Sequence, residues 1–248
     1  MNSINWYQTF FSGLAIPFWQ RAIPPSVTET EIEFVLRQAN LVANSAILDV
    51  PSGAGRHSLM LAKRGYRVTS VDISEDNIRD LITQAEALNL SITPRCVDAL
   101  QSDLGGPYEL VLCLGNSFSY FPYAGMRRFV QNIAAATAPG GRFIINTGVL
   151  AESILLHLKP GFEMETGDIT VRVSNQYLPA DSVLKTEYAF LQGEKTELKT
   201  SFHYVYTLAE ITRLLQGAGF GLLSVFNGLD EQPYQLGDAQ AYLVAQRR

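Results

Sequence analysis

The segment Ile47–Ser58, ILDVPSGAGRHS, carries the residues whose types and spacing best suit the binding of a nucleotide-like ligand. Asp49 stands within an apolar run, and a turn containing Gly53 and Gly55 follows it. The two glycines allow a ligand to approach the backbone because they have no Cβ atom. Asp72 ends the next apolar run, where a carboxylate suits the two hydroxyls of a ribose. These residues predict a site for an adenosine-containing cofactor.

The elements that must position these residues follow from apolar runs and turn signals. Asp49 and Asp72 lie at the ends of two predicted strands, and a helix from Arg56 to about Arg64 joins the strands. A capping box at Thr207–Glu210 opens a late helix. The predicted strands lie at residues 46–50, 66–72, 108–114, 142–147, 222–226 and 241–245. One further strand, the third along the chain, is expected to end at residues 96–99. A further helix is expected over 126–137, before a turn at 139–141.

The turn after the first strand resembles that of the class I S-adenosylmethionine-dependent methyltransferases. A dinucleotide-binding turn would have a third glycine or an alanine where this chain has Ser58. An acidic residue such as Asp49 at the strand end suits a cofactor whose sulfonium and amino groups are cationic. Pro51 stands where that family usually has its first glycine, and we expect the turn to tolerate it because proline fixes φ near −65°.

The resemblance covers about residues 45–150 and 205–248, and it implies both fold and cofactor. The fold is α/β and Rossmann-like, with a seven-stranded, mostly parallel sheet whose last strand is antiparallel, plus an antiparallel β insertion. The cofactor is S-adenosyl-L-methionine. Asp98 and Ala99 would contact the adenine, and the loop after the fourth strand would lie under the methionine part. The implied cofactor-binding residues are Asp49, Pro51, Gly53, Gly55, Arg56, Asp72, Ile73, Asp98, Ala99, Leu114 and Asn116.

The expected chemistry is an in-line displacement at an activated methyl group, so the protein mainly positions a nucleophile. An amine can attack directly, whereas a hydroxyl needs a general base. Tyr120 and Tyr7 are the predicted catalytic residues. His57 is a third candidate, with packing beside the glycine turn as its alternative, and His157 and His203 are expected to be surface or sheet residues.

The predicted acceptor is a small molecule with a nitrogen or oxygen nucleophile. The fourth strand ends without a carboxylate, so no catechol-type metal site is expected and no metal is predicted. The Asn-Pro-Pro-Tyr signature of nucleic-acid amino methyltransferases is absent from residues 115–118, which read Gly-Asn-Ser-Phe. The chain is similar to small-molecule enzymes such as the aminosugar N-methyltransferases. Predicted substrate residues are Phe11, Trp19, Ser119 and Tyr204.

The chain divides into three predicted parts. Residues 1–45 are rich in aromatic residues and interrupted by prolines, which favours a helical lid, with simple packing on the core as the alternative. Residues 46–159 and 207–248 form the methyltransferase core. Residues 160–206 alternate apolar and polar side chains, as antiparallel strands do, and are expected to cover the site, form a dimer contact or serve as a structural flap.

Composition favours a soluble enzyme. The 248 residues are 47% hydrophobic and 17% charged, with a net charge of −5. The sequence has no basic stripe, no apolar run long enough to span a membrane and no signal peptide, so we expect no nucleic-acid or membrane partner, a cytoplasmic location, and a monomer or homodimer. Cys96 and Cys113 are expected in buried strands, as small apolar residues.

Two other functions remain open at this stage. An NAD(P)-dependent oxidoreductase would need the third glycine and a Tyr-x-x-x-Lys pair or similar, and the sequence shows neither. A non-catalytic S-adenosylmethionine-binding protein would keep the cofactor residues and need no catalytic group.

Overall fold

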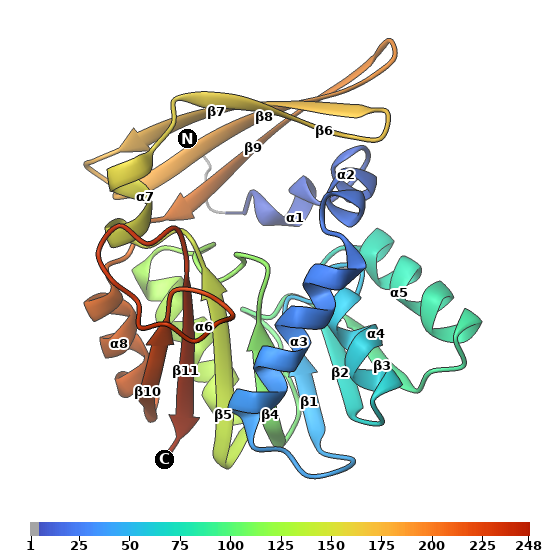
Figure 1. Cartoon of the computed structure of the whole chain (residues 1–248), viewed down its shortest axis with the longest axis vertical. Helices are drawn as coiled ribbons and strands as arrows, with labels where there is room; N and C mark the ends of the chain where they lie inside the picture. The colour runs from blue at the N-terminus through green and yellow to red at the C-terminus, as the bar shows by residue number, and fades with distance from the viewer. Residues whose placement is uncertain (1–4) are drawn as a thin grey trace.

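A seven-stranded sheet forms the core of the computed structural model, which describes residues 5–248. Its strands are β1 (Ala46–Asp49), β2 (Arg67–Asp72), β3 (Ile92–Cys96), β4 (Tyr108–Cys113), β5 (Thr137–Thr147), β10 (Phe220–Phe226) and β11 (Ala241–Arg247). They lie in the order β10–β11–β5–β4–β1–β2–β3 (Figure 1). β11 is antiparallel to both neighbours, while β1 to β5 pair in parallel. The predicted Rossmann-like fold with an antiparallel last strand is confirmed.

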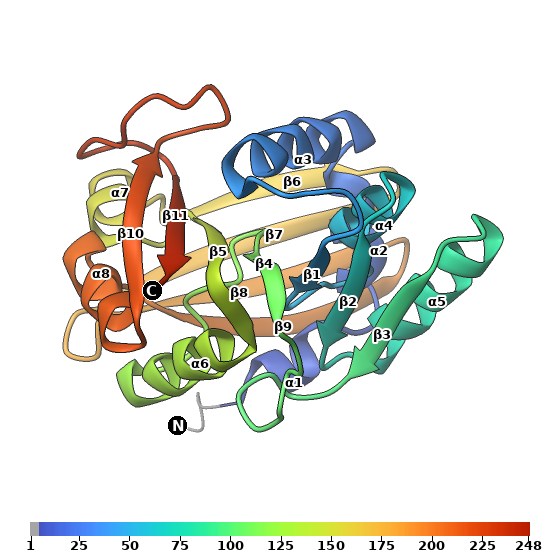
Figure 2. The same ribbon diagram turned by 90° about the horizontal axis from the view of Figure 1, so that it is seen from below.

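Helices cover both faces of this sheet because side chains of successive strand residues point to opposite faces. Ile47 of β1 belongs to the same hydrophobic cluster as Ile32 on one face, and Leu48 belongs to the same cluster as Ile133 on the other. Figure 2 shows α3 and α6 on these opposite faces. The helices of the core are α3 (Pro25–Ala39), α4 (Arg56–Lys63), α5 (Glu75–Ala87), α6 (Tyr123–Ala136) and α8 (Leu208–Gly217).

A second, four-stranded sheet lies beyond the carboxyl ends of the parallel strands (Figure 1). It is antiparallel in the order β6–β7–β8–β9 and follows the short helix α7 (Ala151–His157). A turn at residues 193–194 joins β8 and β9, which pair through Gln192 and Lys195. The predicted antiparallel insertion is thereby confirmed. Its strands are β6 (Gly161–Thr166), β7 (Ile169–Leu178), β8 (Val183–Gln192) and β9 (Lys195–Tyr204).

Two short helices, α1 (Tyr7–Phe10) and α2 (Ala15–Ala22), lie between the two sheets (Figure 1). Phe18 of α2 is buried against Phe190 and other apolar side chains of the second sheet. This segment therefore roofs the edge of the core sheet where ligands of α/β proteins bind. The first four residues of the predicted lid lie outside the described residues.

The helix α3 differs from the rest of the predicted lid segment. It starts at Pro25 and ends at Ala39, because proline is tolerated at the first helical position and Asn40 adopts a left-handed conformation with φ of 51°. Phe34 and Val35 are fully buried against the core sheet. The helix is thus part of the core, and its first turn borders the site through Pro25 and Thr28.

Two smaller expectations are wrong. Cys96 is exposed, although Cys113 is buried, because Cys96 ends β3 at the edge of the sheet. Residues 139–141, expected to form a turn before the strand, lie inside β5, where the pairing with β4 shifts register. No helix within residues 5–248 combines the length and the apolar character that crossing a membrane requires.

Candidate active site

The turn after β1 is tied to the end of β2. Asp72 accepts hydrogen bonds from the backbone N–H groups of Gly53 (2.8 Å, to Oδ2) and Ser74 (2.9 Å, to Oδ1). Burial raises the pKa of Asp72, and these two hydrogen bonds act against that shift. Asn77 Nδ2 donates a third, longer hydrogen bond of 3.4 Å to Oδ1. Since a carboxylate has about four lone-pair positions, Asp72 keeps acceptor capacity for a ligand.

The two glycines of this turn have different surroundings. Both have positive φ, 54° at Gly53 and 82° at Gly55, which side-chain-bearing residues rarely adopt. A Cβ on Gly53 would meet nothing within 4 Å, whereas a Cβ on Gly55 would overlap the side chain of Leu81 on α5. Gly53 borders a cavity, while Gly55, predicted to bind the cofactor, does not line it. The close approach of Leu81 explains why residue 55 is a glycine.

A small inner cavity of about 100 Å³ lies at the ends of β2 and β3. Asp72 and Ile73 line it, as do Asp98 and Ala99 from the loop just after β3. Tyr7 of α1 lines the same cavity, and burial, followed by the neighbouring Asp98 carboxylate, raises the pKa of Tyr7 to about 12. Four predicted cofactor residues are thus brought together, with Tyr7 beside them.

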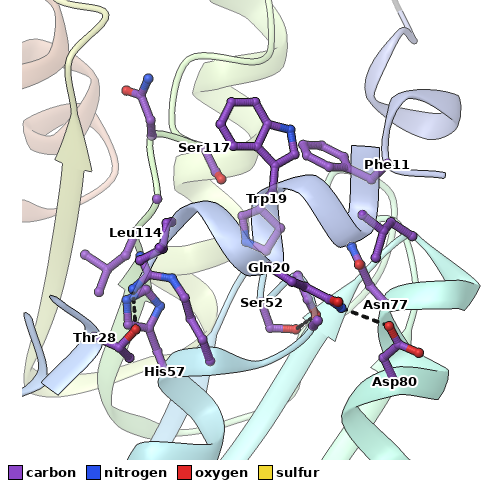
Figure 3. A pocket seen from close by; sticks show the side chains of 18 of the residues that line it. Phe11, Trp19, Gln20, Thr28, Ser52, His57, Asn77, Asp80, Leu114 and Ser117 are labelled. Carbon is purple, nitrogen blue, oxygen red and sulfur yellow. Dashed lines mark hydrogen bonds between the residues drawn. The ribbon is translucent and has the colours of Figure 1, made fainter. Parts of the chain in front are cut away.

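A larger main cleft of about 720 Å³ adjoins the inner cavity, and Pro51 and Gly53 line both. The predicted cofactor residues Leu114 and Asn116 line it from the loop after β4. Figure 3 looks into this cleft, with Phe11 and Trp19 from the N-terminal segment across from Leu114 of the core. A hydrogen bond of 2.9 Å from Gln20 to Asp80 joins α2 to α5 at the same cleft (Figure 3).

Asp49, predicted to bind the cofactor, does not line either cavity. It is 1% exposed, and its Oδ2 accepts a hydrogen bond of 2.7 Å from Ser58 Oγ. Its Oδ1 is buried without a partner in the described residues. Burial raises the pKa of Asp49, against the opposing influence of His57 and Ser58. The carboxylate lies behind the turn and joins β1 to α4.

Glu31 of α3 is a functional candidate that the sequence analysis missed, because it lies in the segment outside the resemblance. It pairs with Arg56, which lines the main cleft, and its Oε2 lies 3.0 Å from His57 Nε2. Arg56 also donates a 2.9 Å hydrogen bond to Thr28. Burial acts to raise the pKa of Glu31, but His57 and Arg56 outweigh it and lower the pKa to about 2. His57 thus holds α3 against the start of α4.

Tyr120 lines both cavities, and its hydroxyl donates a 3.2 Å hydrogen bond to Ser117 Oγ. Its ring centroid lies 4.7 Å from that of Trp6, edge to face. Burial raises the pKa of Tyr120, so its hydroxyl stays protonated at neutral pH. Ser119, predicted to contact substrate, is fully buried and lines neither cavity, whereas Ser117 lines both.

Tyr204, predicted to contact substrate, does not line the cleft, and neighbouring residues of β9 line it. Alternate residues of a strand point to opposite faces, and on β9 the cleft is lined by Ser201 and His203 instead of Tyr204. The His203 ring centroid lies 5.2 Å from that of Trp6 and 5.3 Å from that of Tyr120. His203, expected to be a surface or sheet residue, therefore faces the candidate site.

Residues 47–141, which contain the glycine turn, Asp72, Asp98 and Asn116, match the family described as "Methyltransferase domain". With this domain, the chain is an S-adenosylmethionine-dependent methyltransferase. This methyltransferase is 26% identical over 224 residues to glycine N-methyltransferase of Oryctolagus cuniculus, covering 78% of this chain and 75% of the relative.

Solved structures share the fold of this methyltransferase over nearly its whole length. The CcbJ methyltransferase of Streptomyces caelestis matches with a TM-score of 0.79 and 20% identity, covering 92% of this chain and 98% of that one. CalS10, an amino pentose methyltransferase from Micromonospora echinaspora solved with bound S-adenosylmethionine, matches with a TM-score of 0.71 and 19% identity, covering 92% and 93%.

The residues present fit S-adenosylmethionine, the cofactor of this methyltransferase. The open side of Gly53 leaves room for a ligand against the backbone, and the buried Asp72 carboxylate borders the same cavity. The inner cavity and the main cleft meet at Pro51 and Gly53, so one elongated molecule can extend through both.

Proposed function

We propose that this methyltransferase methylates an amine nitrogen of a small molecule bound at the aromatic part of the main cleft. The observation that supports this most directly is the lining of that part, where Trp6, Phe11 and Tyr120 come together. Aromatic faces stabilise a cation, and the nitrogen of a newly methylated amine is cationic.

The acid–base groups of the cleft also favour nitrogen over oxygen. A hydroxyl acceptor needs a general base, whereas an uncharged amine attacks without one. Among the described residues that line the main cleft, Asp80 is the one carboxylate, and it accepts a hydrogen bond from Gln20. Tyr120 stays protonated because burial raises its pKa. Neither residue suits removal of a proton from a hydroxyl. Two histidines also line the cleft: His57 lies 3.0 Å from Glu31 Oε2, and burial lowers the pKa of His203 to about 4, which makes its imidazole a weak base.

Each part of the cofactor and the acceptor has its own proposed binding residues. Asp72 binds the ribose hydroxyls, Asp98 and Ala99 contact the adenine, and Gly53 and Asn116 border the methionine part. Bound S-adenosylmethionine supplies a methyl group activated by the sulfonium charge. The wall formed by the aromatic side chains excludes water and holds the acceptor close to that methyl group.

The relatives include both kinds of acceptor atom by their names: glycine N-methyltransferase and an amino pentose methyltransferase fit nitrogen, whereas the ubiquinone biosynthesis O-methyltransferase of Caulobacter sp., 29% identical over 173 residues, is named for oxygen. The choice of nitrogen therefore rests on the lining of the cleft. The net charge of −5 and the absence of a basic stripe in the sequence fit a small molecule better than a nucleic acid. The proposed function is compatible with a homodimer as well as with a monomer.

The test uses paired acceptors and cofactor with a labelled methyl group. The purified chain is incubated with glycine, D-glucosamine and benzylamine, and in parallel with their oxygen counterparts glycolate, D-glucose and benzyl alcohol. We expect label in at least one amine and in none of the oxygen compounds. Methylation of an oxygen compound, with its amine counterpart left unmodified, would contradict the proposal.

A further inference from the structure

His203 is a half-buried histidine at the candidate site to which the proposed function gives no task. It stands on β9, more than fifty residues beyond the matched methyltransferase region, and lines the main cleft. Trp6 and Tyr120 flank its ring, with centroids 5.2 and 5.3 Å away. The second sheet therefore places one imidazole among the aromatic side chains where the acceptor is proposed to bind.

The surroundings of His203 keep its imidazole uncharged. Removal from water lowers its pKa to about 4, and no neighbouring charge contributes to the shift. Its Nδ1 lies 3.5 Å from Ser201 Oγ, at the limit of a hydrogen bond, and Nε2 has no partner among residues 5–248. A neutral imidazole has one nitrogen with a free lone pair, so His203 can accept a hydrogen bond from a ligand in the cleft.

We propose that His203 is a positioning residue that accepts a hydrogen bond from an N–H group of the acceptor amine. This inference rests on the proposed function and narrows its substrate class to primary and secondary amines. An N–H held by His203 leaves the nitrogen lone pair free to point away from the imidazole, toward the methyl group. A tertiary amine, when uncharged, has no N–H to donate, so methylation should stop at the tertiary amine.

The transfer balances without a protein base. The nitrogen lone pair forms the new N–C bond, and the electron pair of the breaking C–S bond stays on the sulfur. The proton remains on the methylated nitrogen, because an alkylamine holds it more strongly than the desolvated imidazole, and it leaves with the product. His203 thus orients the acceptor and stays neutral throughout.

The first test observes the imidazole directly. Full-length chain with ¹⁵N-labelled histidine and saturating S-adenosylhomocysteine is titrated at pH 9 with N-methylbenzylamine and, separately, with benzyltrimethylammonium, which has no N–H at any pH. His203→Gln identifies the His203 signals by their loss. We expect the secondary amine to shift a ring nitrogen of His203 and the quaternary ion to leave it nearly unchanged. Equal shifts with both, or none with the secondary amine at the highest concentration reached, would overturn the proposal.

The second test uses two substitutions and the amine that is turned over fastest. His203→Leu removes the acceptor atom and should lower kcat/KM about fivefold or more, the effect of one hydrogen bond. His203→Gln keeps an acceptor oxygen and should recover most of that loss. Both variants should bind S-adenosylhomocysteine like the wild type, and His157→Gln, a control whose Nε2 lies 3.0 Å from Gly237 O, should match it in every measurement.

Equal losses in the two His203 variants, together with weaker S-adenosylhomocysteine binding, would show a packing role and contradict the inference. Formation of a quaternary product at a rate similar to that of the tertiary product would do so as well. If no amine in the panel is methylated, the proposed function fails, while the NMR titration still decides the role of His203.

Discussion

The backbone N–H of Gly53 donates a 2.8 Å hydrogen bond to Oδ2 of Asp72, joining the turn after β1 to the end of β2. The carboxylate that is proposed to bind the ribose therefore also holds the backbone against which the cofactor is proposed to lie. Cofactor affinity and local stability should consequently change together when this residue is altered.

Asp72→Ala should weaken S-adenosylhomocysteine binding at least tenfold, because hydrogen bonds to a charged group contribute roughly 1.5–3 kcal/mol each. It should also lower the melting temperature, since the N–H groups of Gly53 and Ser74 lose their acceptor. Asp72→Asn keeps one acceptor oxygen, so its affinity and its melting temperature should lie between those of the wild type and those of Asp72→Ala. Calorimetry and thermal unfolding measure both effects, and wild-type affinity in a folded Asp72→Ala variant would contradict the assignment.

Gly53→Ala and Gly55→Ala should distinguish a glycine that leaves room for the ligand from a glycine that packs closely against Leu81. Each forces a left-handed alanine, at a cost of about 1–2 kcal/mol. The new methyl group at Gly53 would enter open space, so that variant should fold and bind S-adenosylhomocysteine more weakly. The methyl group at Gly55 would overlap Leu81, so that variant should be clearly less stable in urea. Equal stability of the two variants would show that the Leu81 contact is unimportant.

Glu31→Gln should reduce stability in a pH-dependent way. The pKa of Glu31 is about 2 in the folded chain and 4.5 as the reference value, so its ionised form stabilises the fold fully above pH 4.5. That contribution, at most roughly 3 kcal/mol by this shift, is lost as the pH falls from 4.5 toward 2. Urea unfolding of both proteins should show a large difference at pH 7 that narrows below pH 4. A constant difference would refute the ion-pair explanation.

Tyr120→Phe should lower kcat about fivefold or more, the effect of one lost orienting hydrogen bond, while S-adenosylhomocysteine affinity stays near that of the wild type. Because burial raises its pKa, the hydroxyl would act as a protonated, orienting group. Ser117→Ala, which removes its 3.2 Å partner, is the matched control and should cause a smaller loss. Unchanged turnover in Tyr120→Phe would make the ring a wall residue only.

Hydrogen exchange should distinguish the two parts of the N-terminal segment. We expect the amides of α1 and α2 to become more protected when S-adenosylhomocysteine binds, because these helices roof the cleft. The amides of α3 should be protected with or without ligand, since Phe34 and Val35 are buried in the core. Ligand-independent protection of α1 and α2 would identify them as fixed packing.

The sequence by itself determined the fold class and the cofactor, and it predicted the edge of the sheet at which the site lies. These depend on local signals, namely the glycine turn, Asp72 at a strand end and the capping box at Thr207, which the structure retains. Local signals suffice there because the carboxyl ends of neighbouring parallel strands meet at one edge of the sheet.

Only the tertiary structure decided which side chains face the cleft. Strand alternation sends His203 toward Tyr120 and Tyr204 away, and the loop after β4 presents Ser117 while burying Ser119. Glu31 reaches Arg56 from a different helix, a contact that no local pattern encodes. The acceptor side of the site is built from three segments far apart in the sequence, so its residues could be identified only once the chain had brought them together.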